Sequence, residues 1–368
     1  ITTRFIVGTE LASIKKHAGE VRRVHLLLFA PSLEVAVKFN RALRARDINI
    51  DADGRPIIGM TSHDILELAL ETDERMVVIP AHAWTPWFGV FGSKGGYDSL
   101  EECFEDLTPN VFAIETGLSS NPLMNWRWSK LDNIALISNS DAHSTAKLGR
   151  EVNVMQFENE NEITYDEIMR ILRTTVTPPR PSPTRGGIKK GKHFLYTVEF
   201  YPEEGKYHFD GHRLCNFVCA PAETKKHHGI CPKCRKPLVI GVSNRVEEMA
   251  DRTEVEARGI GEKRIPYKSL VPLPEIIACA LDCGVGTKAV AARYQALIQA
   301  LGSEFNILLH ATLPDIEHAS TPKIAEAVDR VRRGDIFIEP GYDGEFGVVK
   351  VFGPGERVRA RQGALELD

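Results

Sequence analysis

The sequence predicts an α/β protein in which strands and helices alternate, followed by a small metal-binding module and a helical C-terminal part. Apolar runs alternate with helix-like stretches over residues 1–157, four cysteines gather between Cys215 and Cys234, and helical patterning dominates from residue 245. Alternation of strand and helix is typical of a parallel sheet or a β/α barrel. A length of 368 residues is enough for two or three domains.

Five short apolar runs are the expected strands of the first part, and they cover residues 4–7, 25–29, 76–80, 111–114 and 133–137. Helical patterning lies between them at 33–44, 62–71 and 99–106, and a further short helix is expected at 165–173. Ser62 or His63 begins the second of these helices, because Asp64 then falls in the first turn, where a carboxylate is favourable.

The boundary that we expect after the first part has an unusual composition. Residues 177–186, TPPRPSPTRG, are rich in Pro, Gly and Arg, and three lysines follow by residue 192. Such a stretch is either a solvated tether or a strip that contacts phosphates. We therefore expect a barrel domain at 1–176, a basic linker at 177–192, a zinc-binding module at 193–244 and a mostly helical domain at 245–368.

The helical part is expected to contain helices at 274–283, 287–301 and 321–333, and then a short β-turn element at 337–351. The string GVGTK at 284–288 lacks the spacing of a nucleotide-binding loop, so we interpret it as a helix–helix turn. Glycine-rich turns of this kind can bind DNA backbones through their amides.

The charge and the cysteine content limit the partners and the cellular compartment that we expect for the chain. It has 46 basic and 50 acidic residues, a net charge of −4, so any contact with nucleic acid must rest on local basic patches. No run of eighteen apolar residues predicts a membrane span, and no signal peptide is recognisable. Clustering of the seven cysteines favours metal binding in a reducing cytoplasm. The first residue is Ile1 and not Met, which suggests a cut start.

Side chains that can bind metal lie at the ends of the apolar runs, except His25, which lies at the start of its run. In β/α barrels the chemistry lies where strands end. Each residue alone is more simply a structural histidine, a helix cap or an ion-pair partner, but their coincidence at successive strand ends favours a multinuclear metal site. Such sites activate water and neutralise phosphoryl charge. The residues are Glu10, His25, His82, Glu115, Asp141 and His143.

Several long strings resemble the polymerase-and-histidinol-phosphatase (PHP) superfamily, and more narrowly endonuclease Q and its bacterial relatives. They are GTEL (8–11), VRRVHLLLFAPS (21–32), IPAHAWTPWFG (79–89), ETGLSSNPLMNWRWSKLD (115–132) and SNSDAHS (138–144). The resemblance implies a distorted (β/α)7 barrel with two or three metal ions, zinc, magnesium or manganese. It also implies a DNA-repair endonuclease that cuts on the 5′ side of uracil, hypoxanthine, xanthine or an abasic site. DNA is then the partner, together with replication or repair proteins.

The family's ligand positions carry over onto individual residues of this chain. Metal ligands are implied at Glu10, His25, His82, Asp141 and His143, of which the last three are the candidate catalytic residues. Glu115 lies on a strand where many relatives place another ligand. The family's opening His-x-His motif, and the ligand on its second strand, do not occur before Arg4. This departure indicates that the strands carrying them are absent from this chain.

A second metal site is predicted by the Cys231-Pro-Lys-Cys234 pair, a spacing that wraps backbone amides around one ion. Upstream, either His212 and Cys215 or Cys215 and Cys219 complete it. The resemblance over GKYHFDGHRLC (205–215) implies the first choice, with Cys219 as the alternative fourth ligand. A closed site of this kind is a structural zinc that folds a small module. The lysines and arginines around it are either a DNA-backbone surface or simple solvation.

Aromatic residues cluster near the predicted metal site. Enzymes that act at a damaged base extrude it and stack it on aromatic rings. We therefore expect Trp84 and Trp87 to bind substrate, and Asn125 and Arg127 to contact a phosphate or base. Core packing is the simpler alternative for the tryptophans.

Two alternatives to a DNA-repair endonuclease follow from the same residues. A small-molecule phosphoesterase could use the same barrel, although the zinc module and basic linker argue against it. A non-catalytic DNA-binding protein with a degenerate barrel is favoured by the missing His-x-His motif. Metal analysis separates the two, because a degenerate site leaves only the structural zinc.

Overall fold

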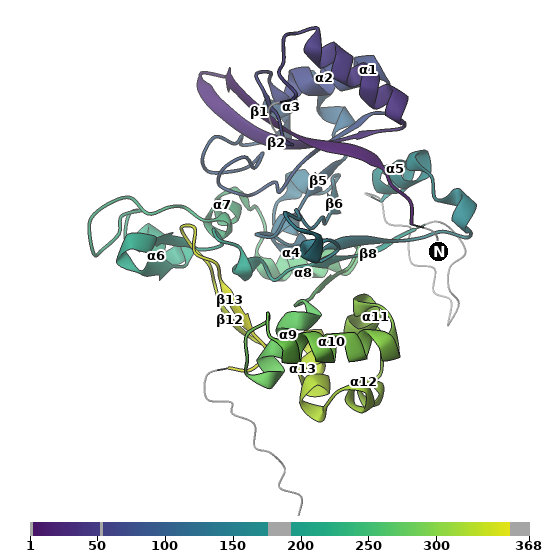
Figure 1. The fold of residues 1–368 in the computed structure, drawn as a ribbon. Helices are drawn as coiled ribbons and strands as arrows, with labels where there is room; N and C mark the ends of the chain where they lie inside the picture. The colour runs from purple at the N-terminus through teal and green to yellow at the C-terminus, as the bar shows by residue number, and fades with distance from the viewer. Residues whose placement is uncertain (1–2, 52–53, 176–192, 354–368) are drawn as a thin grey trace, which may run out of the picture. The chain divides into compact units, whose positions relative to one another are not determined.

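The computed structural model of the chain describes residues 3–51, 54–175 and 193–353, which form two compact units (Figure 1). The first comprises Ile1–Ser269 with Pro340–Gly347, and the second comprises Leu270–Glu339 with Val348–Asp368. The predicted basic linker at 177–192 lies outside the described residues. Among the described residues, no helix is both long and apolar enough to cross a membrane.

The first sheet of unit 1 is built on an antiparallel hairpin of β1 (Val7–His17) and β2 (Glu20–Ala30). A short β3 (Ile57–Ile58) pairs parallel to β1, and β4 (Val77–Pro80) pairs antiparallel to β2. The parallel arrangement that we expected is therefore wrong for β1, β2 and β4. Ala18 and Gly19 join the hairpin with φ values of 49° and 86°, the backbone of a two-residue turn that matches strand twist.

The hairpin also corrects two expectations about the first strand. Residues 4–6 are not part of a strand, because β1 begins only at Val7 and continues to His17. Glu10 and His25 consequently lie inside β1 and β2 and not at strand ends. The turn end of the hairpin is rich in Lys and Arg and is mostly exposed. It therefore lacks the alternation of apolar and polar residues by which a strand is recognised in a sequence.

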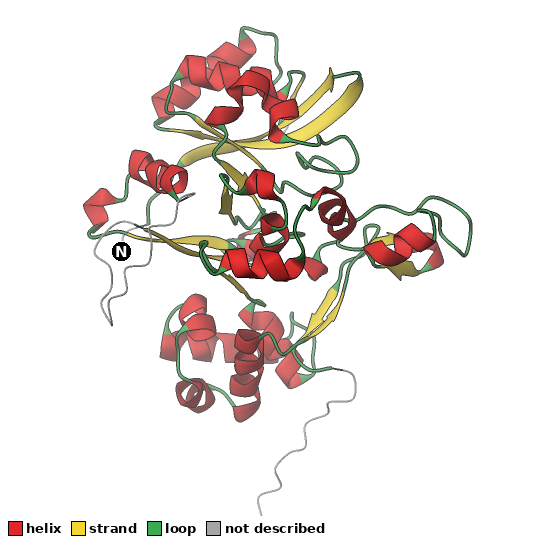
Figure 2. Ribbon diagram, turned by 180° about the vertical axis from the view of Figure 1, so that it is seen from behind, coloured by secondary structure: helices red, strands yellow, loops and turns green. Residues whose placement is uncertain are grey.

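The expected helices of the first half are present. They are α1 (Leu33–Arg44) and α2 (Ser62–Thr72), which lie together beside the first sheet, and α3 (Leu100–Phe104), which continues as the 3-10 helix η1 (Glu105–Asn110) (Figure 2). Thr61 and Asp64 form a reciprocal capping box at the start of α2, which explains why the helix begins where it does. Leucine, isoleucine and phenylalanine side chains of α1 and α2 complete the core beneath this sheet.

The remaining sheets of unit 1 are shorter. β5 (Ala113–Glu115) pairs parallel with β6 (Ala135–Ile137), and β8 (His193–Glu199) lies between β7 (Val152–Gln156) and β11 (Tyr267–Ser269). Connecting helices are α4 (Pro122–Trp126), α5 (Tyr165–Thr174), α6 (Pro221–Lys226), α7 (Val242–Met249) and α8 (Glu254–Gly261). Single 3-10 turns are η2 (Ser129–Leu131), η3 (Thr145–Lys147), η4 (Glu160–Glu162), η5 (Pro202–Glu204) and η6 (Arg213–Cys215), and β9 (Asp210–His212) pairs with β10 (Phe217–Cys219).

Unit 2 is helical, as the sequence predicts. It contains α9 (Leu273–Leu281), α10 (Lys288–Leu301), α11 (Glu304–Leu309), α12 (Leu313–Ala319), α13 (Pro322–Arg333) and a hairpin of β12 (Phe337–Glu339) and β13 (Val348–Lys350). The GVGTK string forms the predicted helix–helix turn, with Asp282 left-handed at the end of α9 and Thr287 capping α10.

Candidate metal centre and cysteine cluster

The side chains of Glu10, His25 and His82 converge in unit 1. Nδ1 of His25 lies 2.8 Å from Oε1 of Glu10, and Nε2 of His82 lies 3.6 Å from the same oxygen. The two imidazole nitrogens are 3.1 Å apart. One atom from each residue therefore faces a common point.

The hairpin register brings Glu10 and His25 together. His25 is opposite Ala12, and Ala12 is two residues from Glu10, so all three side chains project from the same face. Side chains diagonal to one another across an antiparallel pair remain within reach. His82 arrives from a different element, two residues after β4 ends, in a left-handed conformation with φ 29°.

Burial and a stacked ring fix His25. Its side chain is 6% exposed, its ring stacks on Phe88 with 4.2 Å between centroids, and its backbone N–H donates to the carbonyl of Phe88. Phe88 itself has a left-handed backbone, with φ 65°. Because bulky residues rarely adopt this conformation, we infer that the loop after His82 is held in place by its packing.

The electrostatics of the three residues suit a cation. Burial acts to raise the pKa of Glu10, but hydrogen bonds from His25 and His82 outweigh it and hold that pKa far below its ordinary range. Burial lowers the pKa of His25. Burial also acts to lower the pKa of His82, but the carboxylates of Glu10, Glu115 and Asp141 raise it overall. Glu10 is thus ionised, and the surroundings of His82 are negative.

The donor set fits a transition-metal ion. Zinc bound to imidazole at about 2.0–2.1 Å in tetrahedral geometry keeps its ligand atoms roughly 3.3 Å apart. The separations of 2.8, 3.1 and 3.6 Å bracket that value. One carboxylate and two imidazoles suit zinc or manganese. Glu10 also binds Arg55 at 3.2 Å, so a cation already approaches this oxygen.

Glu115 lies behind the converging group and is not part of it. It is 3% exposed at the end of β5, and burial raises its pKa. Its Oε2 accepts the backbone N–H of His82 at 2.6 Å, and its Oε1 accepts Nδ2 of Asn139 at 2.8 Å. As placed, Glu115 holds the main chain of His82.

Asp141 and His143 lie in the loop after β6, and the structure does not bring them into the group with Glu10. Asp141 has φ 42°, and the His143 side chain is 75% exposed. Nδ1 of His143 contacts the carbonyl oxygen of Asp141 at 2.9 Å. The His143 side chain is open to solvent, the Asp141 side chain is half-buried, and the charge of Asp141 acts on His82.

Burial contradicts the expected substrate contacts of Trp84 and Asn125. They are 1% and 0% exposed, and the Trp84 indole N–H donates to Oδ1 of Asn125 at 2.7 Å inside an aromatic core. Arg127 pairs with Glu247 of α7 at 2.5 Å. Trp84 and Asn125 are therefore core residues, and Arg127 links the end of α4 to α7.

Trp87 is the expected aromatic residue that remains accessible, at 38% exposed. Its ring meets that of Tyr207 edge to face, with centroids 5.1 Å apart. Thr85 links this pair to the metal centre, because its hydroxyl lies 2.9 Å from Nδ1 of His82 and 3.0 Å from the carbonyl of Trp87. No local pattern pairs Tyr207 with Trp87, because the two residues are 120 positions apart in the chain.

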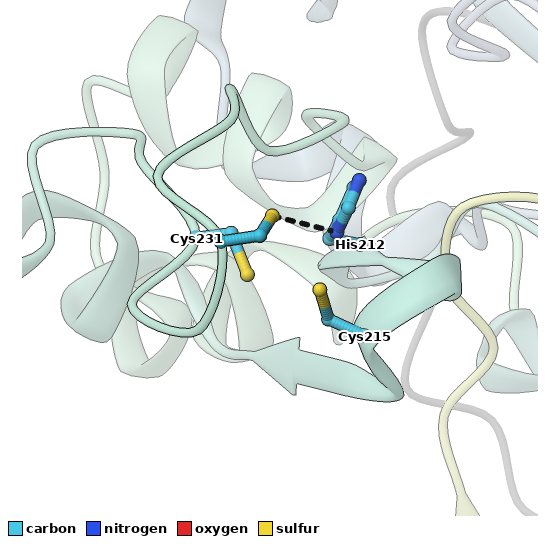
Figure 3. A group of neighbouring side chains, drawn as sticks. His212, Cys215 and Cys231 are labelled. Carbon is cyan, nitrogen blue, oxygen red and sulfur yellow. Dashed lines mark hydrogen bonds between the residues drawn. The ribbon is translucent and has the colours of Figure 1, made fainter.

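The second group comprises His212, Cys215, Cys231 and Cys234, whose ligand atoms all lie within 4.8 Å of one another. Figure 3 shows His212, Cys215 and Cys231 pointing toward one another, and Nδ1 of His212 lies 3.4 Å from Sγ of Cys234. Burial acts to raise the pKa of Cys231, but backbone N–H groups of residues 233 and 234 lower it. The thiolate that a metal requires is thereby favoured, and this cluster could hold a metal ion.

Cys219 points elsewhere. It is buried, and its sulfur contacts the Thr224 hydroxyl at 3.2 Å. The single turn η6 begins after His212 and ends with Cys215, and it is closed by Asn216 in a left-handed conformation. This turn brings the His212 and Cys215 side chains to the same side of the cluster. The structure therefore groups His212, and not Cys219, with the downstream pair.

Known proteins resemble this chain in both sequence and structure. Residues 272–335 match the family model of the MJ0043 C-terminal domain. The uncharacterized protein MJ0043 of Methanocaldococcus jannaschii is 30% identical over 299 residues, which are 79% of this chain and 35% of that protein. The uncharacterized protein YqxK of Bacillus subtilis is 27% identical over 95% of this chain and 79% of its own length. The chain thus spans about a third of the first relative's length.

Two solved structures are similar throughout. The lesion-specific endonuclease PfuEndoQ from Pyrococcus furiosus has a TM-score of 0.76 and 29% identity, covering 93% of this chain and 77% of that one. An endonuclease Q complex with a 27-mer duplex that has an abasic lesion at its active site has a TM-score of 0.77 and 28% identity, with 97% and 81% covered.

Proposed function

We propose that this chain is part of a metal-dependent DNA endonuclease that cuts 5′ to a deaminated or damaged base. The observation that carries the proposal is the similarity to a lesion-specific endonuclease over 93% of the chain at 29% identity. The proposal assigns residues 1–176 to a PHP-type barrel and 193–244 to a zinc-binding module. It assigns DNA contacts to the helical region 245–368.

The candidate centre supplies the chemistry. Glu10, His25 and His82 would hold one divalent ion, zinc, manganese or magnesium. When bound, such an ion neutralises charge on the scissile phosphate and lowers the pKa of an attacking water. Glu10 contributes a carboxylate that stays ionised, and His25 contributes an imidazole kept neutral by burial. We assign Asp141 and His143 to the same site, because the charge of Asp141 acts on His82 and the His143 ring contacts the Asp141 carbonyl.

The aromatic pair of Trp87 and Tyr207 offers a place for an extruded base next to this centre. Trp87 and Tyr207 meet edge to face, and the Trp87 side chain is exposed enough to offer its ring to a base. The Thr85 hydroxyl connects this aromatic pair to His82, since it contacts both the His82 ring and the Trp87 carbonyl. The base specificity, whether uracil, hypoxanthine, xanthine or an abasic site, would therefore be read within a few residues of the metal.

The cysteine cluster has a structural role in this proposal. With four ligands it leaves no open position for catalysis, and a zinc ion there would fold the module around β9 and β10. Lysine and arginine residues of the same segment would contact the DNA backbone.

A nicking assay on the full-length protein that contains this chain tests the proposal. Duplexes containing uracil or hypoxanthine are offered with magnesium or manganese, and a cut 5′ to the lesion is expected. Glu10→Gln and Asp141→Ala should abolish cutting and leave DNA binding intact. Glu20→Gln is the matched control, because Glu20 is at the exposed turn of the same hairpin.

The rival functions make different predictions in this assay. Hydrolysis of a small phosphate ester without cutting of DNA would favour a small-molecule phosphoesterase. DNA binding without cutting, with a single zinc per chain, would favour a degenerate, non-catalytic barrel. Either result would overturn the proposal.

A further inference from the structure

We infer that Asn139 is a positioning residue for the candidate metal centre. It holds the carboxylate of Glu115, and that carboxylate holds the main chain of His82. The inference shares with the proposed function only the assignment of Glu10, His25 and His82 as metal ligands.

The first step is the contact between Glu115 and His82. The backbone N–H of His82 donates to Oε2 of Glu115 at 2.6 Å, a short hydrogen bond of the charge-assisted kind. His82 needs such support, because its φ of 29° is a conformation that residues other than glycine seldom adopt. Without the contact, the His82 backbone would be free to relax, and its imidazole would move away from Glu10.

The second step is the contact between Asn139 and Glu115. The carboxylate is 3% exposed, and its Oε1 accepts Nδ2 of Asn139 at 2.8 Å. A buried carboxylate without a donor pays a large desolvation penalty. Asn139 supplies a donor without adding charge, and it sets the direction of the carboxylate toward His82.

The third step is the support of Asn139 itself. Its Oδ1 accepts Nδ2 of Asn153 at 3.2 Å, and Asn153 lies within β7. Asn153 is clamped in turn, because its Oδ1 accepts the backbone N–H of Ser138 at 2.9 Å and its Nδ2 donates to the Ser138 carbonyl at 2.9 Å. The relay therefore runs from a strand, through two amides and one carboxylate, to a candidate ligand.

The relay has a counterpart in known metal sites, in which groups that orient a ligand contribute to affinity although they do not touch the ion. Loss of such a partner weakens metal binding by about 10- to 100-fold. Asn139→Ala should therefore lower metal affinity, because Oε1 of the buried Glu115 carboxylate loses its donor and the carboxylate is free to turn away from His82.

Mn²⁺ binding, followed by electron paramagnetic resonance, measures this directly. One zinc ion per chain is supplied first, because the thiolates of the cysteine cluster prefer zinc and so leave the Glu10 group to Mn²⁺. We expect Asn139→Ala to weaken Mn²⁺ binding by about 10- to 100-fold. The matched control is Asn110→Ala, because Asn110 is a partly buried asparagine that donates only to the nearby Leu107 carbonyl. It should bind Mn²⁺ as the parent does.

If Asn139→Ala destabilises the fold, a double-mutant cycle with Glu115→Ala still tests the inference. Mn²⁺ binding is compared among the parent, the two single variants and the double variant. If Asn139 acts through Glu115, the two substitutions together should weaken binding no more than Glu115→Ala alone. Additive losses, or unchanged Mn²⁺ binding by a folded Asn139→Ala protein, would overturn the inference. These readouts need no DNA cleavage, so a parent protein that binds Mn²⁺ but never cuts would reject the proposed function alone.

Discussion

Gly117 packs directly against His82. A Cβ added to Gly117 would lie 2.7 Å from the Cβ and 2.8 Å from the Cα of His82, and the φ of Gly117 is +65°. The residue therefore has to be glycine for two reasons, the close approach and the left-handed backbone. Replacement by alanine must displace either His82 or the strand end that carries Gly117.

We therefore predict that Gly117→Ala impairs the candidate metal centre. The substitution should cost about 1–2 kcal/mol from the backbone alone, with a further loss from the clash. Mn²⁺ titration measures affinity, and urea unfolding measures stability.

Gly302→Ala is the control for this substitution. Gly302 has a φ of +84° with no atom within 4 Å of the added methyl, and it lies in unit 2. It should lose stability but keep parental Mn²⁺ affinity. Equal Mn²⁺ affinity in both variants would show that the contact with His82 does not matter.

The cysteine cluster predicts which residues retain zinc. His212→Ala should lower zinc affinity at least about 10-fold, because it removes one of four ligands, whereas Cys219→Ser should bind zinc as the parent does. Zinc per chain is measured after dialysis against a chelator of graded strength. The reverse order of the two variants would make Cys219 the fourth ligand.

Trp87 allows base recognition to be separated from cutting. If Trp87 stacks on an extruded base, Trp87→Ala should reduce cutting at uracil by about 5- to 150-fold, since one base–aromatic stack is worth about 1–3 kcal/mol. An abasic site has no base to stack, so cutting there should change little. Trp84→Phe is no control, because Trp84 is a core residue. Equal losses on both substrates would mean that Trp87 has only a structural role.

Two buried carboxylates predict a pH dependence of stability. Glu151 and Glu199 flank the paired residues Val152 and Val198 of neighbouring strands. Burial raises the pKa of Glu199 to about 7, and burial together with the charge of Glu199 raises the pKa of Glu151. Like charges at adjacent strand positions destabilise a sheet unless one group is protonated.

The direction of this pH dependence follows from the proton that Glu199 binds on folding. Because the folded state holds the Glu199 proton more tightly than the unfolded state, this contribution is fully present below about pH 4.5 and is lost as the pH rises through about 7. It amounts to something on the order of 3 kcal/mol. Glu199→Gln should therefore gain stability over the parent between pH 5 and 8 in urea unfolding. Glu158→Gln, at an exposed position, is the control, and parallel curves for parent and Glu199→Gln would contradict the assignment.

Most of the helices could be predicted from the sequence, because their signals are local. The helices expected at 62–71 and 321–333 are confirmed, and each is marked by a cap within a few residues of chain, Thr61 with Asp64 and Thr321 with Pro322. The Cys231–Cys234 pair is equally local, since its spacing alone indicates a metal. Strand pairing is not local, and the antiparallel β1–β2 hairpin was missed because Ala18–Gly19 is a weak turn signal between polar strand ends.

The sequence by itself determined which residue types could bind a metal in this protein and that they belong to a unit of mixed strands and helices. The tertiary structure alone decided which of them meet. Strand register brings Glu10 to His25, and a left-handed backbone brings His82 to both. Trp84 and Asn125, which sequence position alone made candidates, are instead buried in the core. The physical reason is that convergence and burial depend on contacts between residues tens of positions apart, which no local pattern records.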